Sequence, residues 1–271
     1  MPLIDTLETS LRKQQTQYFG KYRAFVADTE DPEILGRIKM VVPSVLGEAE
    51  TDWALPAVAY GGGENYGILA VPPVGSQVLA EFLEGDPSSP VWTGTFWRAP
   101  AEMPAEYTGQ TTKILKTESG HVLTFEDQDG EEAVTLRSSA QAEVVLDPDG
   151  GMALTDAGGA KVVIDAAANE ITVEDAHGNA IVLSSSGITC TDINGNEIKA
   201  SASGVDVKSA AIVNIEGSQV TVAGAGGEPL IKGATFLSMF NSHTHATGAG
   251  PSGPPIPPLT PAVLTTKSTA Q

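Results

Sequence analysis

The chain is poor in cysteine, in basic residues and in aromatic residues. Its one cysteine, Cys190, cannot form an intrachain disulfide. Fifteen basic residues stand against thirty-four acidic ones, a formal net charge of −19 that repels nucleic-acid phosphates and anionic membrane surfaces. Aromatic residues make up 6% of the sequence, and no run of about 18 apolar residues is present to span a bilayer. These absences argue against nucleic acid as a partner and against a membrane-spanning helix.

The N-terminal residues carry no secretion signal of the usual kind. The start MPLIDTLETSLRK has neither a basic region nor a long apolar core, so we expect synthesis and folding in a reducing cytosol. Leu3, Ile4, Leu7 and Leu11 lie at helical spacing, which predicts a short amphipathic helix over about residues 3–18. Its apolar stripe is narrow, and we expect residues 1–20 to form an arm that docks on something else.

The next segment, residues 21–97, has the pattern of a small β-barrel. Five short runs rich in β-branched and aromatic residues are separated by proline, glycine and acidic turns; they are KYRAFVAD, LGRIKMVVP, DWALPAVAY, GSQVLAEFLE and SPVWTGTFW. Five strands in about eighty residues predict an OB-fold. Eleven acidic and four basic residues lie between positions 18 and 97, so the nucleic-acid use of that fold is not expected.

After a proline-containing linker over residues 98–111, the composition changes to small and β-branched residues with recurring glycine. GNAIVLSSSGITCTDIN from Gly178 and GNEIKASASGVDVKSAA from Gly195 match at an offset of seventeen residues. Each copy predicts two short strands around a tight turn, with too little apolar surface to fold alone. We therefore expect residues 112–235 to form a narrow β-prism shared between chains, with threefold symmetry as the simplest closure.

Two of these segments resemble a known family. LGRIKMVVPSV and VPPVGSQVLAEFLEGDPSSPVWTGTFW resemble the OB-fold domain of central spikes of contractile tails, of the baseplate assembly protein V type. TESGHVLTFEDQDGEE resembles the start of the needle in those spikes and in the valine-glycine repeat proteins of type VI secretion. The two matches together cover about residues 21–235.

The resemblance implies an all-β homotrimer with an OB-fold collar and an intertwined triple-stranded β-helix that pierces a membrane when a sheath contracts. Implied partners are baseplate hub proteins, contacted through the N-terminal arm and the OB domain, a conical tip protein and the target cell envelope. The implied location is the tail baseplate of a virion made in the host cytoplasm, with an extracellular toxin-injection particle or a type VI apparatus as alternatives. No domain that degrades cell wall fits into the short linker, so we expect no enzyme.

Residues 236–271 form the predicted tip and proline-rich tail. If the segment FLSMFNSHTH is extended, His243 and His245 lie on the face that begins with Leu237 and Met239. Three chains would then bring six imidazoles to one axis, a donor set that suits an octahedral first-row metal. The resemblance implies iron, one ion per trimer. The alternative, exposed histidines with no ligand, stays open, as does whether the tail folds back along the needle or holds a separate conical tip protein.

Other residues suggest chemistry less strongly. Ser119, His121 and Asp127 contain the residue types of a nucleophilic triad, but the sequence around them favours a strand entering a turn. The alternating acids Asp129 and Glu131 belong to a segment too short for a calcium loop. A polysaccharide-degrading β-helix is the rival of another class, and the scarcity of aromatic residues in residues 112–235 argues against it.

Overall fold

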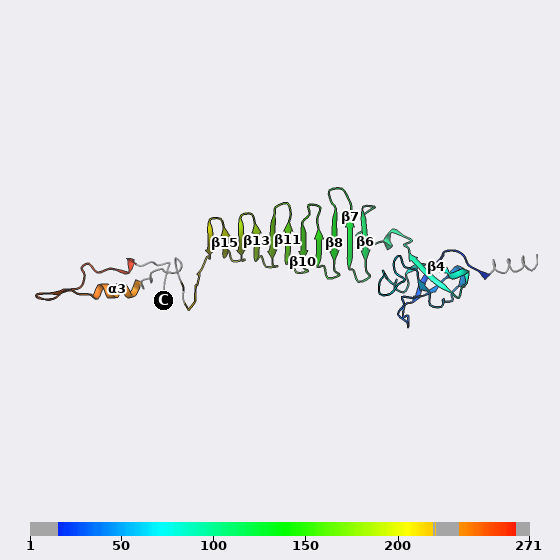
Figure 1. The fold of residues 1–271 in the computed structure, drawn as a ribbon, viewed down its shortest axis with the longest axis horizontal. Coiled ribbons are helices and arrows are strands. Elements are labelled where there is room, and N and C mark those ends of the chain that lie inside the picture. The colour runs from blue at the N-terminus through cyan, green and yellow to red at the C-terminus, as the bar shows by residue number, and fades with distance from the viewer. Residues whose placement is uncertain (1–15, 219, 221–232, 264–271) are drawn as a thin grey trace, which may run out of the picture. The chain divides into compact units, whose positions relative to one another are not determined.

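The computed structural model describes residues 16–218, 220 and 233–263 (Figure 1). The helix expected over residues 3–18 lies almost wholly outside them. The chain divides into two compact units, residues 1–188 and 189–271, which are described separately. Strands dominate both the segment 21–97 and the segment that follows the linker, so the predicted all-β class is confirmed. No helix among the described residues is long and apolar enough to cross a bilayer.

Each of the five segments expected to be OB-fold strands contains one. The strands are β1 Tyr22–Asp28, β2 Lys39–Val41, β3 Leu55–Pro56, β4 Gln77–Phe82 and β5 Pro90–Thr95, accompanied by the short helix α2 Pro43–Leu46. They form one sheet in the order β2-β1-β4-β5-β3, with β3 parallel to β5 and the other pairs antiparallel. The order mixes strands distant in sequence, as in the partly open Greek-key barrel of an OB-fold.

The hydrophobic core lies inside this five-stranded sheet. Strand β4 alternates strictly: Val78, Ala80 and Phe82 are buried and the residues between them are half-buried. The core comprises Ala24, Val26, Ile38, Met40, Val42, Ala54, Val78, Ala80, Phe82 and Trp92. Each fully buried larger aliphatic side chain contributes about 1.5–3 kcal/mol. Residues 21–97 can thus bury a core of their own within one chain.

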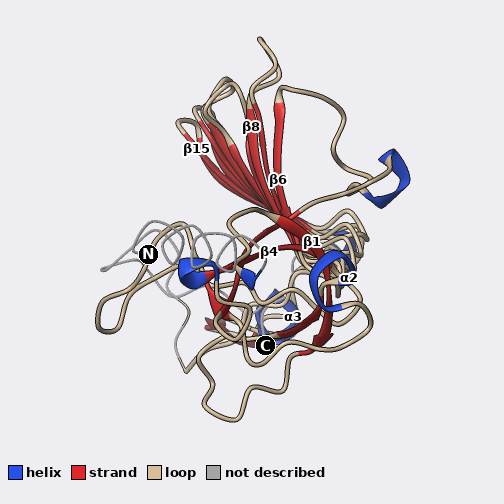
Figure 2. Ribbon diagram, turned by 90° about the vertical axis from the view of Figure 1, so that its right-hand side faces the viewer, coloured by secondary structure: helices blue, strands red, loops and turns tan. Residues whose placement is uncertain are grey.

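The segment after the linker folds as a long meander. Its strands are β6 Thr112–Lys116, β7 Val122–Glu126, β8 Ala133–Arg137, β9 Glu143–Leu146, β10 Met152–Thr155, β11 Lys161–Asp165, β12 Glu170–Glu174, β13 Ala180–Ser184, β14 Gly187–Thr191, β15 Glu197–Ser201 and β16 Gly204–Lys208. They follow one another in space in chain order, as the row of arrows in Figure 1 shows. Viewed along the row, the strands lie in one twisted layer (Figure 2).

The seventeen-residue repeat appears as a repeated turn. Asp175 accepts hydrogen bonds from the backbone N–H groups of His177 and Asn179, and Asp192 accepts them in the same way from Asn194 and Asn196. A glycine with positive φ follows at the same place in each turn, Gly178 at 92° and Gly195 at 80°. Only glycine adopts that conformation without strain. The sequence repeat therefore reports a structural unit of turn and strand.

One face of the meander is almost entirely aliphatic. Cross-strand partners on this face form two continuous rows, the first of Leu115, Leu123, Leu136, Val144, Leu154, Val162, Val173 and Ile181, the second of Phe125, Val134, Leu146, Met152, Ile164, Ile171 and Leu183. We call these fifteen residues the apolar ladder. Eleven of them are exposed in the single chain. The only buried apolar residue described beyond Trp97 is Val122, so one chain leaves the ladder without a core.

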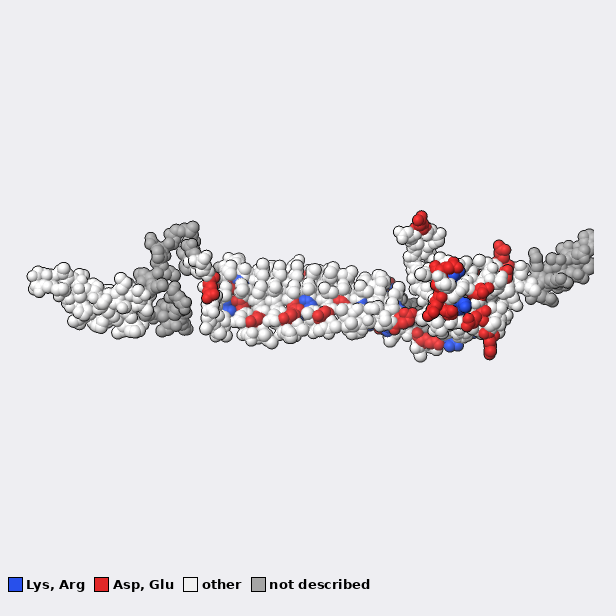
Figure 3. Space-filling view, turned by 90° about the horizontal axis from the view of Figure 1, so that it is seen from below, with Lys and Arg blue, Asp and Glu red and all other residues white. Residues whose placement is uncertain are grey.

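From β7 to β13, the charged residues of the sheet lie at the ends of the strands. Arg137 lies opposite Glu143, and Lys161 forms an ion pair of 3.1 Å with Glu174. In the space-filling view, acidic and basic side chains form a row along the sheet, with uncharged atoms on both sides of it (Figure 3). Opposite charges across neighbouring strands stabilise a sheet modestly. Their placement leaves the strand centres free for aliphatic and β-branched residues.

The C-terminal segment differs from the expectation. Residues Gly233–Ser242 form a helix, α3, so the extended conformation assumed for residues 236–242 is wrong. A helix satisfies its backbone hydrogen bonds internally, whereas an extended segment needs a neighbouring strand to do so. A two-residue hairpin follows, β17 Ala246–Thr247 with β18 Gly250–Pro251, and the turn Pro261–Val263 ends the described chain.

Candidate functional site

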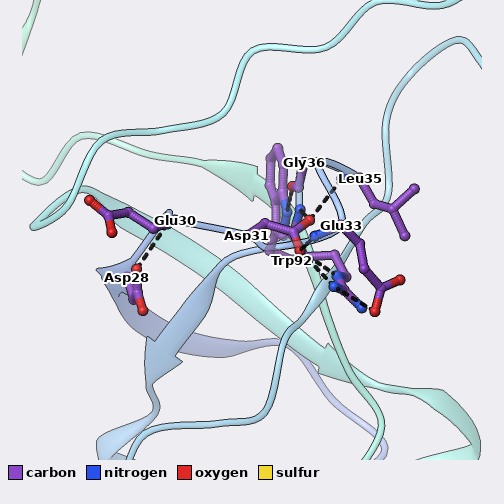
Figure 4. Close-up of polar contacts among 8 residues, drawn as sticks. Asp28, Glu30, Asp31, Glu33, Leu35, Gly36 and Trp92 are labelled. Carbon is purple, nitrogen blue, oxygen red and sulfur yellow. Dashed lines mark hydrogen bonds and ion pairs between the residues drawn. The ribbon is translucent and has the colours of Figure 1, made fainter.

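The loop between β1 and β2 is organised around one carboxylate. Asp31 accepts hydrogen bonds from the backbone N–H groups of Glu33, Leu35 and Arg37 at 3.1, 2.8 and 3.2 Å. It also accepts two from the guanidinium of Arg37, at 3.0 Å from Nε and 2.6 Å from Nη2. Figure 4 shows the backbone of the loop wrapped around this carboxylate. One side chain thus fixes seven consecutive residues in a single conformation.

The charge of this carboxylate is strongly favoured. The side-chain hydrogen bonds from Arg37 hold the pKa of Asp31 well below its usual value of 3.8, although burial of the carboxyl acts in the opposite direction. The side chain of Asp31 is only 4% exposed and that of Arg37 14%. The pair is therefore ionised throughout the physiological pH range, and the loop does not switch with pH there.

The base of the same loop is tied to the core and to a second loop. The indole N–H of Trp92, a core residue, donates to the carbonyl of Gly36 at 3.2 Å (Figure 4). Gly36 has φ +73°, and a Cβ there would lie 2.8 Å from a methyl carbon of Leu69. The positive φ favours glycine, and an added Cβ would also have to displace the Leu69 side chain. The loop is consequently held from three sides.

The tip of the loop presents apolar side chains to solvent. Ile34 is 90% exposed and Leu35 51% exposed. The backbone of Ile34 has φ 55°, in the left-handed region that a β-branched residue rarely adopts. Asp31 and its hydrogen bonds enforce this conformation. A strained residue held in place by its surroundings is a candidate for function.

The linker is anchored to the strands on both sides of it. The carboxylate of Glu106 forms ion pairs with Lys116 of β6 at 2.8 Å and with Arg137 of β8 at 2.9 Å. Gln77 of β4 donates to Glu102 at 3.0 Å. A shallow cavity of about 580 Å³ lies within the linker, lined by Trp97, Arg98, Ala99, Pro100, Met103, Pro104, Ala105 and Tyr107. The linker is thus an ordered connection rather than a loose tether.

The two predicted metal-ligating histidines lie side by side. The rings of His243 and His245 meet edge to face, with centroids 5.1 Å apart. Nδ1 of His243 lies 2.5 Å from the carbonyl oxygen of Phe240, at the end of α3. Because a carbonyl only accepts, this contact assigns the proton to Nδ1 and leaves Nε2 with a free lone pair. A ring held in this way is oriented as metal-ligating histidines commonly are.

The tail folds back onto the helix that precedes the histidines. The side-chain amide of Asn241 donates to the carbonyl of Leu259 at 2.9 Å and accepts from its N–H at 2.9 Å. His245 and Ser252 are joined by two further hydrogen bonds of 2.8 Å. These contacts pin Ser252 and Leu259 to the unit that contains α3.

A single chain does not complete a metal site at this pair. Among the described residues, no group of three or more His, Cys, Asp or Glu side chains is arranged to hold a metal ion. Two imidazoles with one free nitrogen each supply too few donors for a closed tetrahedral or octahedral site. The donor set fits a metal only when several chains bring their pairs together.

The residues that resembled a catalytic triad serve turns and strands instead. The Ser119 hydroxyl contacts that of Thr117 at 3.2 Å, and Nδ1 of His121 accepts from the backbone N–H of Ser139 at 3.2 Å. Asp127 forms an ion pair with Lys113. Cys190 is half-buried in β14. None of these contacts joins the serine to the histidine, so the structure does not assemble the triad among these described residues.

The loop tip at Ile34 was not identified from the sequence. The composition of TEDPEI indicates only a turn, and an isoleucine in a turn gives no sign of its φ angle. The spacing of Asp31 and Arg37 across PEILG was the available signal, because an aspartate early in a turn commonly accepts from the following N–H groups.

Comparison with known proteins gives a family match for one part of the chain. Residues 22–97 match the family model described as the type VI secretion system/phage-baseplate injector OB domain. The spike protein VgrG3 of the Vibrio cholerae type VI secretion system is 31% identical over 147 residues, covering 49% of this chain and 14% of that protein. The type VI spike protein VgrG5 of Pseudomonas aeruginosa is 35% identical over 105 residues, covering 34% of this chain and 13% of that protein.

A third relative carries an activity in its name. The actin cross-linking toxin VgrG1 of Vibrio cholerae is 31% identical over the same length, 147 residues, and the match covers 13% of that protein. The chain thus spans about a seventh of the length of these relatives. Among solved structures, the TCP domain of SAS-4 from Drosophila melanogaster has a TM-score of 0.24 at 11% identity, too weak to support an argument.

Proposed function

We propose that this chain, whose residues 22–97 match the injector OB domain of phage baseplates and type VI secretion systems, is the membrane-piercing central spike of a contractile injection machine. The phage tail baseplate is the first setting that we propose, because the matched family model includes phage-baseplate injectors. A type VI apparatus is the second, favoured by the printed names of the relatives. The genes that neighbour this one distinguish the two settings.

The apolar ladder is the observation that carries the proposal. A soluble protein rarely leaves a contiguous apolar surface of this length open to water. The ladder is regular from β6 to β13, and its shape suits the same surface of further copies better than a small ligand. Three chains whose ladders face one axis close the surface with a single repeated interface. We therefore propose a homotrimer with the ladder as its shared core.

The mechanical role follows from this architecture. Neighbouring strands are joined by continuous backbone hydrogen bonds, and the strand ends carry the charges that keep the outer surface in water. A narrow prism closed in this way resists bending and buckling when pushed along its axis. Sheath contraction supplies the work, the prism transmits it, and the C-terminal unit meets the target envelope. No catalytic step is part of this mechanism.

A metal ion at the tip belongs to the proposal. Three copies of the pair His243 and His245 would supply six imidazoles, with Nε2 of each His243 free to bind because Nδ1 donates to Phe240. The ion, iron by family likeness, would cross-link the three chains at their ends. Imidazole donors accept several first-row metals, so the donor set by itself does not select iron.

The mass of the purified protein tests the proposal directly. Light scattering is expected to give about 84 kDa, three chains of 28.0 kDa, at all concentrations that can be measured. A monomer of 28.0 kDa that stays soluble would refute the shared core, because one chain cannot bury the ladder.

A further inference from the structure

We propose that the tip of the β1–β2 loop, Ile34 with Leu35, is a docking knob that inserts into an apolar socket rimmed by lysine and arginine on a protein partner. The inference rests on the proposed function, in which that partner is the baseplate hub protein. It goes beyond that function because it assigns the contact to two named residues and states the chemistry of the partner's surface.

The exposure of the knob is enforced and not incidental. Five hydrogen bonds to Asp31, two of them from the Arg37 side chain, hold a 90%-exposed isoleucine at φ 55°. Glycine or asparagine would occupy this position without the same steric cost. An apolar side chain kept in a strained conformation in water has no stabilising role in the chain itself. Burial of Ile34 in a partner protein would explain why this strained, exposed conformation is kept.

The knob is also rigid before it binds. The Trp92 indole and the Leu69 side chain hold the loop at Gly36, two residues beyond the tip. A preformed loop loses little conformational entropy on docking. The free energy gained by burying its apolar side chains is therefore not offset by the cost of ordering the loop. Central apolar anchors of this kind dominate the energetics of many interfaces.

The charge around the knob identifies the chemistry of the partner. Glu30 and Glu33 flank the tip. Glu33, whose side chain is 64% exposed, shares the single guanidinium of Arg37 with Asp31, so the acids of the loop outnumber its bases. The segment between positions 18 and 97 carries eleven acids and four bases. The same acidic loop of a second copy would be repelled, as would an anionic lipid surface. A protein socket with a basic rim complements both the charge and the apolar centre.

The experiment measures binding of the full-length chain to the purified hub protein by titration calorimetry, together with thermal unfolding of each variant. Ile34→Asn is expected to weaken binding by about tenfold or more, while the melting temperature stays the same or rises, because asparagine tolerates this backbone conformation. Ile212→Asn, at an isoleucine that is 75% exposed in the other unit, is the matched control and is expected to bind normally.

The salt dependence tests the basic rim. Affinity of the wild-type chain should fall as sodium chloride rises from about 0.05 to 0.5 M, since exposed charges are screened over that range. If the wild type and Ile34→Asn bound the hub with equal affinity, Ile34 would not be the docking residue. If the affinity did not depend on salt, the partner's socket would not have a basic rim. Failure of the wild-type chain to bind the hub would overturn the docking proposal. The mass of the trimer would still test the proposed spike function independently.

Discussion

At the scale of single residues, the β1–β2 loop depends on the ionised carboxylate of Asp31. Its pKa is lowered in the folded protein, so its contribution to stability is complete above the unfolded value of 3.8 and is lost as the pH falls below it. Asp31→Asn should lower stability at neutral pH and flatten the acid-induced loss below about pH 4.

Denaturant unfolding measured across this pH range checks the prediction. Asp52→Asn is the control, since it removes the same charge from an exposed position. If the two variants lost stability equally at neutral pH and kept the same acid dependence, Asp31 would not organise the loop.

Gly36 tests the contact between the two loops. Gly36→Ala should destabilise the protein by about 2 kcal/mol, because alanine combines an unfavourable positive φ with a clash against Leu69. Gly47→Ala has the same conformational penalty, at φ +61°, with nothing within 4 Å of the new Cβ, and should cost only about 1 kcal/mol. Urea unfolding curves of both variants give the difference, which isolates the contact with Leu69.

At the scale of the element, the β15–β16 hairpin tests which face of the sheet is shared. Ile198 lies opposite Val207 and Ala200 opposite Val205, whereas Lys199 lies opposite Asp206 on the other face. Val205→Asp would place three carboxylates in one layer of the proposed trimer, at a cost of several kcal/mol that prevents or loosens association. Asp206→Ser removes only one cross-strand charge pair, worth less than about 1 kcal/mol.

Thermal melting and light scattering of the two variants distinguish the faces. Val205→Asp should melt earlier and dissociate, and Asp206→Ser should resemble the wild type. Similar melting of both variants would mean that the face with Ile198 and Val205 is not the buried one.

At the scale of the whole molecule, the core and the proposed association site lie in different parts of the chain. Residues 21–97 contain the buried cluster, and the ladder begins at Leu115. A truncated chain that ends at residue 100 should therefore fold and remain monomeric, because its apolar residues are already buried within one chain. Light scattering of a stable trimer from that fragment would assign trimerisation to the OB domain instead.

The metal proposal also belongs to the assembled molecule. Elemental analysis of the trimer, prepared without chelators and with iron available, should find one ion per three chains. The double variant His243→Ala, His245→Ala should lose the ion while circular dichroism of the β-structure is unchanged. Wild-type trimer that contains no metal would leave the pair as exposed histidines packed against α3.

The sequence alone determined the features that depend on local chemistry. Alternation of apolar and polar residues located all five OB-fold strands, and acidic and glycine-containing turns marked the strand ends of the meander. The seventeen-residue repeat predicted two short strands around a tight turn in each copy. The hairpins β13–β14 and β15–β16 confirm it, with matching hydrogen bonds to the hydroxyls of Ser184 and Ser201 in their turns. The same short motif forms the same turn wherever it occurs, because all its partners lie within a few residues.

Only the tertiary structure decided the features that depend on distant partners. The register between strands aligned the fifteen ladder residues into two rows, and no single strand contains that information. Residues 233–242 form the helix α3 instead of the extended segment assumed from the sequence, and this places His243 and His245 at the end of a helix. The strained tip at Ile34 arises because Asp31, Trp92 and Leu69 constrain the loop together, and two of these three residues lie more than thirty positions away in the sequence.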